Sequence, residues 1–314
     1  MRRITLDAAG LPLSALLAVP AGTPRATVVA LHGGGMNAGY FDGQADPGLS
    51  LLTLGARLGY TVLALDRPGY GASAERLPEG QTLAEQAASL SAALHGFTAV
   101  HPYGAGLLLL AHSYGGKLAL TAAARSVHDR LLGLDISGCG HRYDVTPEEL
   151  PDEGAHGSRR LNWGPLGLYP PETFTAAASV VAGMPVRERV EAARWPEEFP
   201  AVAADVRVPV RLTFAEFEAW WRHDEEAVTE LRSHLAAPRV VVDRLPGAGH
   251  NISLGWAARA YHLRALGFLE ECLQSSAGGG GGGGGRPPPP PPAGGGLREG
   301  PRRGAGGRHK RRLQ

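Results

Sequence analysis

Short apolar runs alternate with segments of helical periodicity along most of this chain, and this alternation limits the possible folds more than any other feature. Predicted strands lie at residues 26–31, 60–65, 106–111, 131–136, 209–214 and 240–245, and predicted helices at residues 49–58, 82–94, 114–126, 222–236 and 256–273. Strands and helices that alternate in this way form a mostly parallel sheet with helices on both faces. The period-2 pattern of residues 4–17, around a turn at residues 7–10, predicts an additional N-terminal hairpin.

A long gap between two predicted strands marks an insertion. More than sixty residues separate Ile136 from Pro209, and a structureless loop of that length is improbable inside a compact domain. We therefore predict a helical lid at residues 139–204, inserted between two parts of one core at residues 1–138 and 205–274. Residues 275–314 contain eight consecutive glycines and six consecutive prolines. Such sequence buries too little apolar surface to fold, so we predict a disordered tail.

Charge and composition narrow the choice of partner. The formal net charge is +1, but residues 286–314 hold eight Lys or Arg and one Glu, which leaves an acidic body. An acidic body argues against nucleic acid as a partner of the folded domain. No apolar run reaches the roughly 18 residues that a membrane span requires, and two distant cysteines do not form a disulfide framework. Arg2-Arg3 and the mildly apolar residues 11–19 superficially resemble a signal peptide, but their period-2 pattern favours a hairpin. We therefore predict a cytoplasmic protein without a membrane span.

One buried strand is predicted to run directly into a helix with a serine at the junction. Residues 107–116 read LLLLAHSYGG, which places Ser113 at this point. The segment resembles the nucleophile elbow of the α/β-hydrolase superfamily, normally G-x-S-x-G. Ala111 stands at the first glycine and still meets the demand for a small residue. The resemblance implies the α/β-hydrolase fold with Ser113 as nucleophile; the alternative is a serine that only caps the helix.

A serine nucleophile needs a base and an acid that orients the base. Residues 245–251, LPGAGHN, follow the last predicted strand and resemble the loop that carries the histidine of this fold, so His250 is the expected base. The acid is expected after the preceding strand. If that strand ends at Phe214, Glu218 stands where the acid follows this strand in the superfamily that the chain resembles. Glu216 is the competing carboxylate, and Asp144 is a more distant alternative.

The run His32-Gly33-Gly34-Gly35 resembles the oxyanion loop of esterases and lipases on this fold. The resemblance implies that the backbone N–H groups of Gly34 and Gly35, together with that of Tyr114, bind the oxyanion. His32 is expected to brace the loop. Residues 66–73, DRPGYGAS, resemble a further turn of the fold but name no catalytic group.

The resemblance implies a serine hydrolase that cleaves an ester or thioester through an acyl-enzyme on Ser113. The lid aromatics Trp163, Tyr169 and Phe174 are expected to bind an apolar acyl group of a small-molecule substrate. A C–C bond hydrolase or an acyltransferase would use the same triad, and a non-catalytic ligand receptor on this fold is a further alternative. The chain has no His-x-x-x-His and no phosphate-binding Lys-Ser/Thr after its glycine-rich run. We therefore expect no metal and no cofactor.

Overall fold

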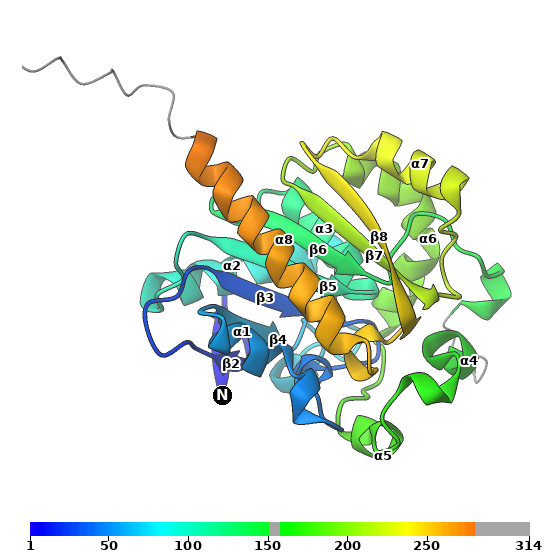
Figure 1. Ribbon diagram of the computed structural model, residues 1–314, viewed down its shortest axis with the longest axis horizontal. Helices are drawn as coiled ribbons and strands as arrows, with labels where there is room; N and C mark the ends of the chain where they lie inside the picture. The colour runs from blue at the N-terminus through cyan, green and yellow to red at the C-terminus, as the bar shows by residue number, and fades with distance from the viewer. Residues whose placement is uncertain (151–157, 280–314) are drawn as a thin grey trace, which may run out of the picture.

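The computed structural model describes residues 1–150 and 158–279, and a single twisted sheet lies at its centre (Figure 1). Its strands are β1 (Arg2–Ala8), β2 (Leu11–Ala18), β3 (Thr27–Leu31), β4 (Thr61–Leu65), β5 (Leu107–His112), β6 (Leu131–Ser137), β7 (Val210–Phe217) and β8 (Val240–Gly249). Within the described residues the sheet has eight strands in the order β1-β2-β4-β3-β5-β6-β7-β8. Only the pairs β1/β2 and β2/β4 are antiparallel. The predicted mostly parallel sheet and the N-terminal hairpin are therefore confirmed.

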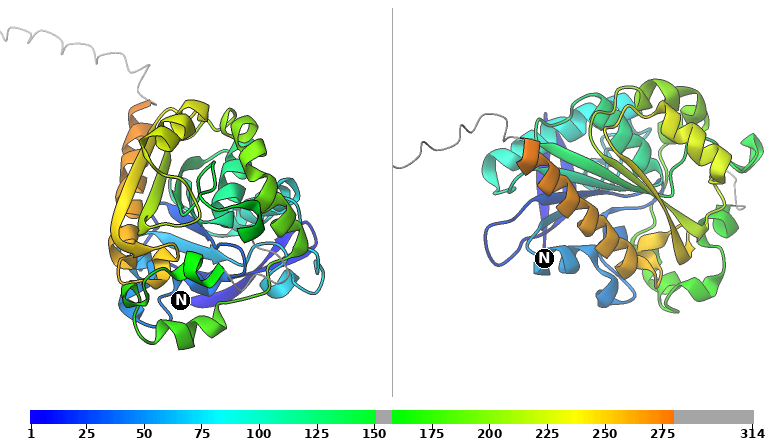
Figure 2. Two further views of the ribbon diagram at one scale, coloured as in Figure 1. Left: turned by 90° about the vertical axis from the view of Figure 1, so that its right-hand side faces the viewer. Right: turned by 45° about the horizontal axis from the view of Figure 1, so that its top comes forward.

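Helices cover both faces of this sheet. The helices of the core are α1 (Leu51–Arg57), α2 (Leu83–Val100), α3 (Tyr114–Ala124), α7 (Glu225–His234) and α8 (Ala258–Gly279). Helix α8 crosses the face that α1 also covers, and α2 and α3 lie on the opposite face (Figures 1 and 2). None of the helices in the described part of the chain combines the length and the apolar character that crossing a bilayer requires.

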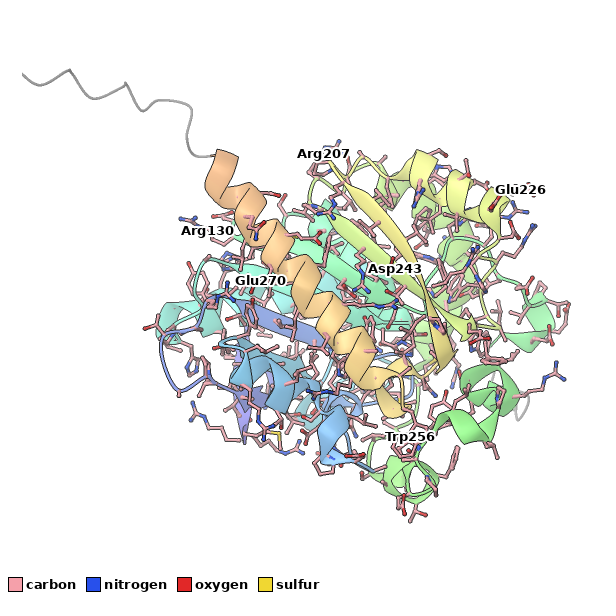
Figure 3. The ribbon with its side chains drawn as sticks, in the orientation of Figure 1. Arg130, Arg207, Glu226, Asp243, Trp256 and Glu270 are labelled. Carbon is pink, nitrogen blue, oxygen red and sulfur yellow. The ribbon has the colours of Figure 1, made fainter. Side chains whose placement is uncertain are left out.

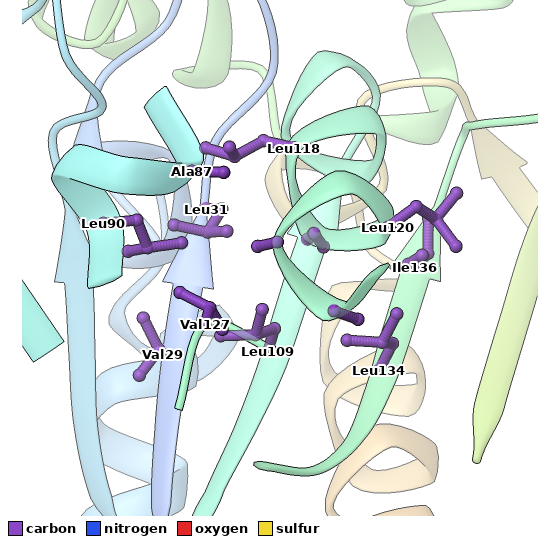
Figure 4. Close-up of a cluster of buried hydrophobic side chains, with 14 of the residues drawn as sticks. Val29, Leu31, Ala87, Leu90, Leu109, Leu118, Leu120, Val127, Leu134 and Ile136 are labelled. Atoms are coloured by element: carbon purple, nitrogen blue, oxygen red, sulfur yellow. The ribbon is translucent and has the colours of Figure 1, made fainter. Parts of the chain in front are cut away.

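Side chains on the two faces of the sheet pack into two separate apolar cores. In β3, Val29 and Leu31 pack with α2 and α3, whereas Val28 and Ala30 pack with α1 and α8. Figure 4 shows the first of these cores, where side chains of β3, β5 and β6 meet those of α2 and α3. A fully buried Leu or Val side chain contributes about 1.5–3 kcal/mol relative to an exposed one. The alternation along each strand therefore fixes the sheet between its two helical layers.

Capping explains where several helices begin and end. Helix α7 begins at Glu225, three residues after its predicted start, because Asp224 accepts the N–H of Ala227 at 2.9 Å and caps it. Helix α8 continues to Gly279, beyond its predicted end at residue 273. The Ser275 and Ser276 hydroxyls donate to carbonyls one turn earlier in this last part of the helix. Of the tail predicted at residues 275–314, the first five residues thus continue α8, and the others lie outside the described residues.

Among the residues that the structure describes, the predicted lid region contains three α-helices: α4 (Ser158–Trp163), α5 (Thr173–Ala176) and α6 (Val186–Ala203). Helix α6 is the longest of these and continues through Pro196 and Pro200. The reason is a buried stripe at helical spacing, Ala192, Trp195, Phe199 and Ala203. Burial of this stripe stabilises the helix although each proline removes one backbone donor. Residues 151–157 of the predicted lid lie outside the described residues.

Candidate active site

Ser113 occupies the sharp turn between β5 and α3. Its backbone has a φ of +52° and a ψ of −117°, a conformation that a residue with a side chain adopts only where the surroundings hold it. The N–H of Ser113 donates to the carbonyl of Ser137 at 2.8 Å, and the N–H of Gly116 donates to the carbonyl of Ser113 at 2.9 Å. The Ser113 side chain makes no capping bond to α3. The structure therefore does not support the alternative in which this serine only caps the helix.

Small residues allow α3 to approach the glycine-rich loop at residues 32–35. A Cβ atom on Gly115 would lie 2.7 Å from the carbonyl oxygen of His32, and one on Gly33 would lie 3.1 Å from the Cβ of Ser113. Ala111 is fully buried and stands opposite Leu31 of β3. The turn thus tolerates a methyl group at the first small position, whereas Gly115 has no room for one.

His250 and Glu218 come together from the ends of the neighbouring strands β8 and β7. The Nδ1 atom of His250 lies 2.9 Å from Oε2 and 3.0 Å from Oε1 of Glu218, and both side chains are buried. The N–H of Trp220 donates to Oε1 at 3.0 Å and so holds the carboxylate in place. Because the carboxylate engages Nδ1, the other ring nitrogen, Nε2, is free to exchange a proton with a serine hydroxyl.

The strand that leads to Glu218 ends later than predicted. We placed its end at Phe214, but β7 continues to Phe217. Its pairing with β8 has an irregularity between Ala215 and Phe217. This local change in register is not visible in the hydrophobic pattern, because it depends on the partner strand. The predicted strand end at Phe214 was therefore wrong, although Glu218 does contact the histidine.

The two competing carboxylates point elsewhere. Glu216 is exposed, and its Oε2 accepts the N–H of Gly247 at 2.7 Å. Asp144 is also exposed. Of the three candidates, Glu218 is the one whose carboxylate contacts His250.

His112 and Gly138 bring the serine turn close to His250. The ring centroid of His112, the residue before Ser113, lies 4.8 Å from that of His250. A Cβ atom on Gly138 would lie 2.9 Å from Cε1 of His250 and 3.0 Å from Cε1 of His112. Burial, together with the neighbouring His250, lowers the pKa of His112 well below its ordinary value, so this ring packs as a neutral group. The serine turn and the Glu218–His250 pair therefore share the carboxyl edge of the sheet.

The N–H groups of the predicted oxyanion loop are not equivalent. The N–H of Gly35 donates to the hydroxyl of Tyr70 at 3.0 Å, so it is already engaged. Gly34 lines the same cavity as Ser113. Tyr114 is the first residue of α3, and the N–H groups of a first helical turn have no partner within their helix. Gly34 and Tyr114 are therefore the better placed of the three predicted donors.

Arg67 supports the glycine-rich loop at residues 32–35 from within the core. Its buried guanidinium donates from Nε to the carbonyl of His32 at 2.8 Å and from Nη2 to the carbonyl of Gly33 at 3.1 Å. The carbonyl of Gly33 and the N–H of Gly34 belong to one peptide group, and in a trans peptide these two point in opposite directions. The N–H of Gly34 consequently points away from Arg67. His32 also braces this arrangement, since its Nε2 accepts the N–H of Arg67 at 3.1 Å.

Glu188 of α6 connects the lid region to this support. Its carboxylate pairs with Arg67, with 3.1 Å between Oε2 and Nη2, and both side chains are fully buried. The same Oε2 accepts the hydroxyl of Tyr70 at 2.7 Å. Glu188, Arg67 and Tyr70 thus form one network that reaches from the predicted lid region to the backbone of the glycine-rich loop at residues 32–35.

A cavity of about 960 Å³ opens over the serine turn. Its volume lies at the upper end of the range for small-molecule sites. Ser113, Tyr114 and Gly34 line it from the core. Residues of the lid region, among them Trp163, line it from the other side. A substrate in this cavity would therefore contact both the serine and the lid.

The three predicted lid aromatics divide between the cavity and the layer beneath it. Trp163 and Phe174 line the cavity, whereas Tyr169 does not. Tyr169 is buried and packs edge-on against both, with ring centroids 5.1 Å from Trp163 and 5.9 Å from Phe174. A Cβ atom on Gly255 would lie 3.5 Å from its ring, which shows how closely the core backbone approaches it. Tyr169 was predicted to contact substrate, but it lies beneath the cavity wall and supports the rings of Trp163 and Phe174.

The two cysteines, Cys139 and Cys272, are buried and free, and neither is activated as a second nucleophile. Burial raises the pKa of the Cys139 and Cys272 thiols to about 11, so both stay protonated near neutral pH. Within residues 1–150 and 158–279, no cluster of three or more His, Cys, Asp or Glu side chains is arranged to hold a metal ion.

Three residues that shape this site were not anticipated from the sequence: Arg67, Glu188 and Lys117. Arg67 lies in the turn at residues 66–73, which indicated only the fold. Lys117 lies in the first turn of the helix that follows Ser113, and this closeness in sequence was the available signal that both line one cavity. Glu188 gave no signal, because its partner lies more than a hundred residues away along the chain.

Comparison with solved structures supports the same fold. An N-acyl homoserine lactonase, AidH, complexed with N-hexanoyl homoserine lactone has 16% identity and a TM-score of 0.60, covering 87% of this chain and 99% of that one. A thermostable carboxyl esterase from Bacillus coagulans has 15% identity and a TM-score of 0.65, covering 87% and 98%. The thioesterase domain of the curacin biosynthetic pathway has 15% identity and a TM-score of 0.59, covering 85% and 99%.

Family-level comparison agrees with these structures. A comparison with curated protein sequences finds no match. The model of the alpha/beta hydrolase family matches residues 28–264, from β3 into α8, and so includes the serine turn and the Glu218–His250 pair. Because this match spans more than half of the sequence, the chain belongs to the alpha/beta hydrolase family.

Proposed function

We propose that this chain is a serine hydrolase that cleaves a carboxylic ester or thioester of a small molecule through an acyl-enzyme on Ser113. The buried Glu218–His250 pair beside the strained serine turn carries the proposal. A serine hydroxyl is a weak nucleophile at neutral pH and becomes reactive when an oriented imidazole accepts its proton. The solved esterase and thioesterase structures of this fold are consistent with this chemistry.

In the proposed mechanism, the Oγ of Ser113 attacks the acyl carbonyl carbon while Nε2 of His250 accepts the hydroxyl proton. Glu218 stabilises the imidazolium that forms. The bond to the leaving oxygen or sulfur then breaks, and His250 gives its proton to the leaving group. Water attacks the acyl-enzyme, His250 accepts a proton from it, and the same proton returns to Ser113 as the acid product leaves.

The N–H groups of Gly34 and Tyr114 are the proposed donors to the oxyanion. The N–H of Gly35, which the sequence also suggested, is engaged by the hydroxyl of Tyr70 at 3.0 Å, so we assign Gly35 a role in holding the loop. Loss of one oxyanion donor typically lowers the rate about 100- to 1000-fold. The Arg67 network that orients Gly34 is therefore part of the proposed catalytic apparatus.

A fluorophosphonate that reacts with activated serines tests the proposal directly. We expect the wild-type protein to be labelled and to hydrolyse short acyl esters, and we expect Ser113→Ala to lose both properties. The matched control is Ser233→Ala, because Ser233 lies on the exposed surface of α7. Labelling of Ser113→Ala at the wild-type level would place the nucleophile elsewhere and reject the proposal.

The assignment of the acid is tested by a pair of amide replacements two residues apart. Glu218→Gln keeps the size of the side chain but removes the charge that stabilises the imidazolium. We expect kcat to fall by about 10³ or more, by analogy with amide replacement in a serine protease triad. Glu216→Gln, on the exposed side of the same strand, should change kcat less than about tenfold. The reverse order would assign the orienting role to Glu216.

A further inference from the structure

Lys117 is a buried cation on the wall of the candidate active site. It is the fourth residue of α3, which begins directly after Ser113. Both line the cavity, and Lys117 is only 3% exposed. Most charged residues in the described part of the chain are not buried, and Figure 3 shows Arg130, Arg207 and Glu226 on the surface. The position of Lys117 is therefore an exception.

Aromatic rings and one hydroxyl surround the ammonium group. The Nζ atom of Lys117 lies 4.5 Å from the ring centroid of Trp221, 5.4 Å from that of Tyr143, and 5.8 Å from those of Tyr114 and Trp195. It donates one hydrogen bond, to the hydroxyl of Tyr143 at 3.2 Å. An ammonium has three N–H donors. The rings stabilise the positive charge through their π faces, but they do not use the remaining donors.

The described part of the chain supplies no direct counter-ion for this charge. Among residues 1–150 and 158–279, no carboxylate lies within 4.0 Å of Nζ. Burial lowers the pKa of Lys117 to about 8; Cys139 and Glu188 oppose this shift, and Arg67 adds to it. The tyrosines beside Nζ stay neutral, because burial raises the pKa of Tyr114 and Tyr143. Lys117 is therefore charged at neutral pH.

The charges that line the cavity have one sign. Among its described lining residues, Lys117 and the exposed Arg160 are cations, and none is an Asp or Glu. A lysine that served only to fill space between the rings would be replaced without loss by methionine or leucine, since burying an unpaired charge is unfavourable. A negative group on a bound molecule would instead use the free donors of Lys117 and offset this unfavourable burial.

We propose that Lys117 binds a carboxylate of the substrate, so that the preferred ester or thioester carries a carboxylate a few carbon atoms from the carbonyl that Ser113 attacks. This inference rests on the proposed function. The short spacing follows from the fold, because Lys117 stands in the first turn of the helix that begins directly after Ser113 and both residues line the same cavity. Apolar contacts with residues such as Trp163 and Phe174 would hold the carbon chain between the two ends.

Two pairs of esters test the proposal on the two sides of the scissile bond. For the acyl side, the 4-nitrophenyl monoester of glutaric acid is compared with 4-nitrophenyl 5-methylhexanoate, in which an isopropyl group replaces the carboxylate. For the leaving-group side, 4-carboxyphenyl butyrate is compared with 4-carbamoylphenyl butyrate. After correction for uncatalysed hydrolysis, the wild type should prefer the carboxylate in one pair by about tenfold or more in kcat/KM, mainly through KM. Charged hydrogen bonds typically give this discrimination.

Lys117→Met should reduce that preference to about one. The matched control is Arg160→Gln, which removes a cation from the exposed part of the cavity and should change the preference less than about threefold. A preference that survives Lys117→Met, or that disappears in Arg160→Gln, would overturn the assignment to Lys117. Equal hydrolysis of both members of both pairs by the wild type would reject the carboxylate while leaving the proposed function intact.

Two further measurements keep the proposal independent of the variant's folding and of catalysis. In the wild type, the preference for the carboxylate ester should decline as the pH rises through about 8, because Lys117 loses its proton while the carboxylate stays charged. An unchanged preference up to pH 10 would contradict the proposal.

Calorimetry of Ser113→Ala with monomethyl glutarate should show binding that the double variant with Lys117→Met lacks. If no ester is cleaved and no serine is labelled, the proposed function fails, and this binding result alone decides the role of Lys117.

Discussion

Two buried cations contact the ring of Tyr114 and differ in their other partners. The guanidinium carbon of Arg67 lies 4.8 Å from the ring centroid and Nζ of Lys117 lies 5.8 Å from it. Arg67 has the carboxylate of Glu188, two backbone carbonyls and the side chain of Gln86 as partners. Lys117 has one hydroxyl and ring faces. Arg67, which is fully paired, therefore holds the backbone of the glycine-rich loop in place. Lys117, which has no carboxylate partner among the described residues, is available to bind a negative group of a ligand.

The largest expected effect comes from leaving Arg67 without its counter-ion. Glu188→Gln keeps the shape of the network but leaves a fully buried positive charge uncompensated. Breaking a buried pair in this way usually lowers the free energy of unfolding by about 3–5 kcal/mol. Urea denaturation of the variant and the wild type measures this difference.

The control for this variant is Glu198→Gln on the same helix. Glu198 lies 3.8 Å from Arg194 in a pair that is largely exposed, so its loss should change the free energy of unfolding by less than about 0.5 kcal/mol. Equal effects of the two replacements would show that burial of the Arg67–Glu188 pair has no special importance.

Lys117→Met should change the free energy of unfolding in the opposite direction and raise it. The pKa of Lys117 falls from 10.5 to about 8 on folding, and each pKa unit corresponds to about 1.4 kcal/mol. Burial of the charge therefore disfavours the native state by up to about 3 kcal/mol at pH 7, and methionine removes this penalty. The variant should be more stable than the wild type in urea denaturation. A loss of more than about 2 kcal/mol would make Lys117 a structural residue like Arg67.

The pH dependence of that difference provides a sharper test. Below about pH 8 the lysine is charged in both the folded and the unfolded state, so the full penalty is present. Between about pH 8 and 10.5 the unfolded state binds more protons than the native state, and the stability of the wild type therefore rises relative to Lys117→Met. Parallel unfolding curves at pH 7, 9 and 10 measure this change, and a difference independent of pH would contradict it.

The smallest effect is expected for Arg160→Gln. Arg160 lines the same cavity but is exposed, and water screens an exposed charge. The free energy of unfolding should change by less than about 0.5 kcal/mol at pH 7 and at pH 9. A larger change would show that Arg160 shares the buried environment of Lys117.

The sequence predicted the features that depend on local pattern. The apolar runs anticipated all strands of the parallel part of the sheet, because buried strands need apolar side chains on both faces. Ser113, His250 and Glu218 were singled out because each follows one of these strands. Glu218 contacts His250 although β7 ends at Phe217 instead of Phe214, and Glu216, beside the irregular pairing with β8, is exposed.

The features that the sequence did not predict depend on contacts between distant segments. Helix α6 passes through two prolines because its buried stripe packs against the core. The N–H of Gly35 is engaged because Tyr70 lies beside it, 35 residues away in the chain. Lys117 was not singled out because its surroundings come from separate segments, with Tyr143 after β6, Trp195 on α6 and Trp221 after β7. The hydrophobic pattern of a single segment cannot show which distant side chains will surround a residue.

The rings around Lys117 also give the cavity an intrinsic optical signal. Of the five tryptophans in the chain, Trp163, Trp220 and Trp221 line the cavity, and Trp195 lies near the same ammonium group. Indole emission shifts and changes in intensity when a charge within a few ångströms appears, disappears or is neutralised. Arrival of a carboxylate at Lys117, or loss of its proton, would therefore change the fluorescence of the unlabelled protein, so that occupancy of the site can be followed in real time and at low concentration.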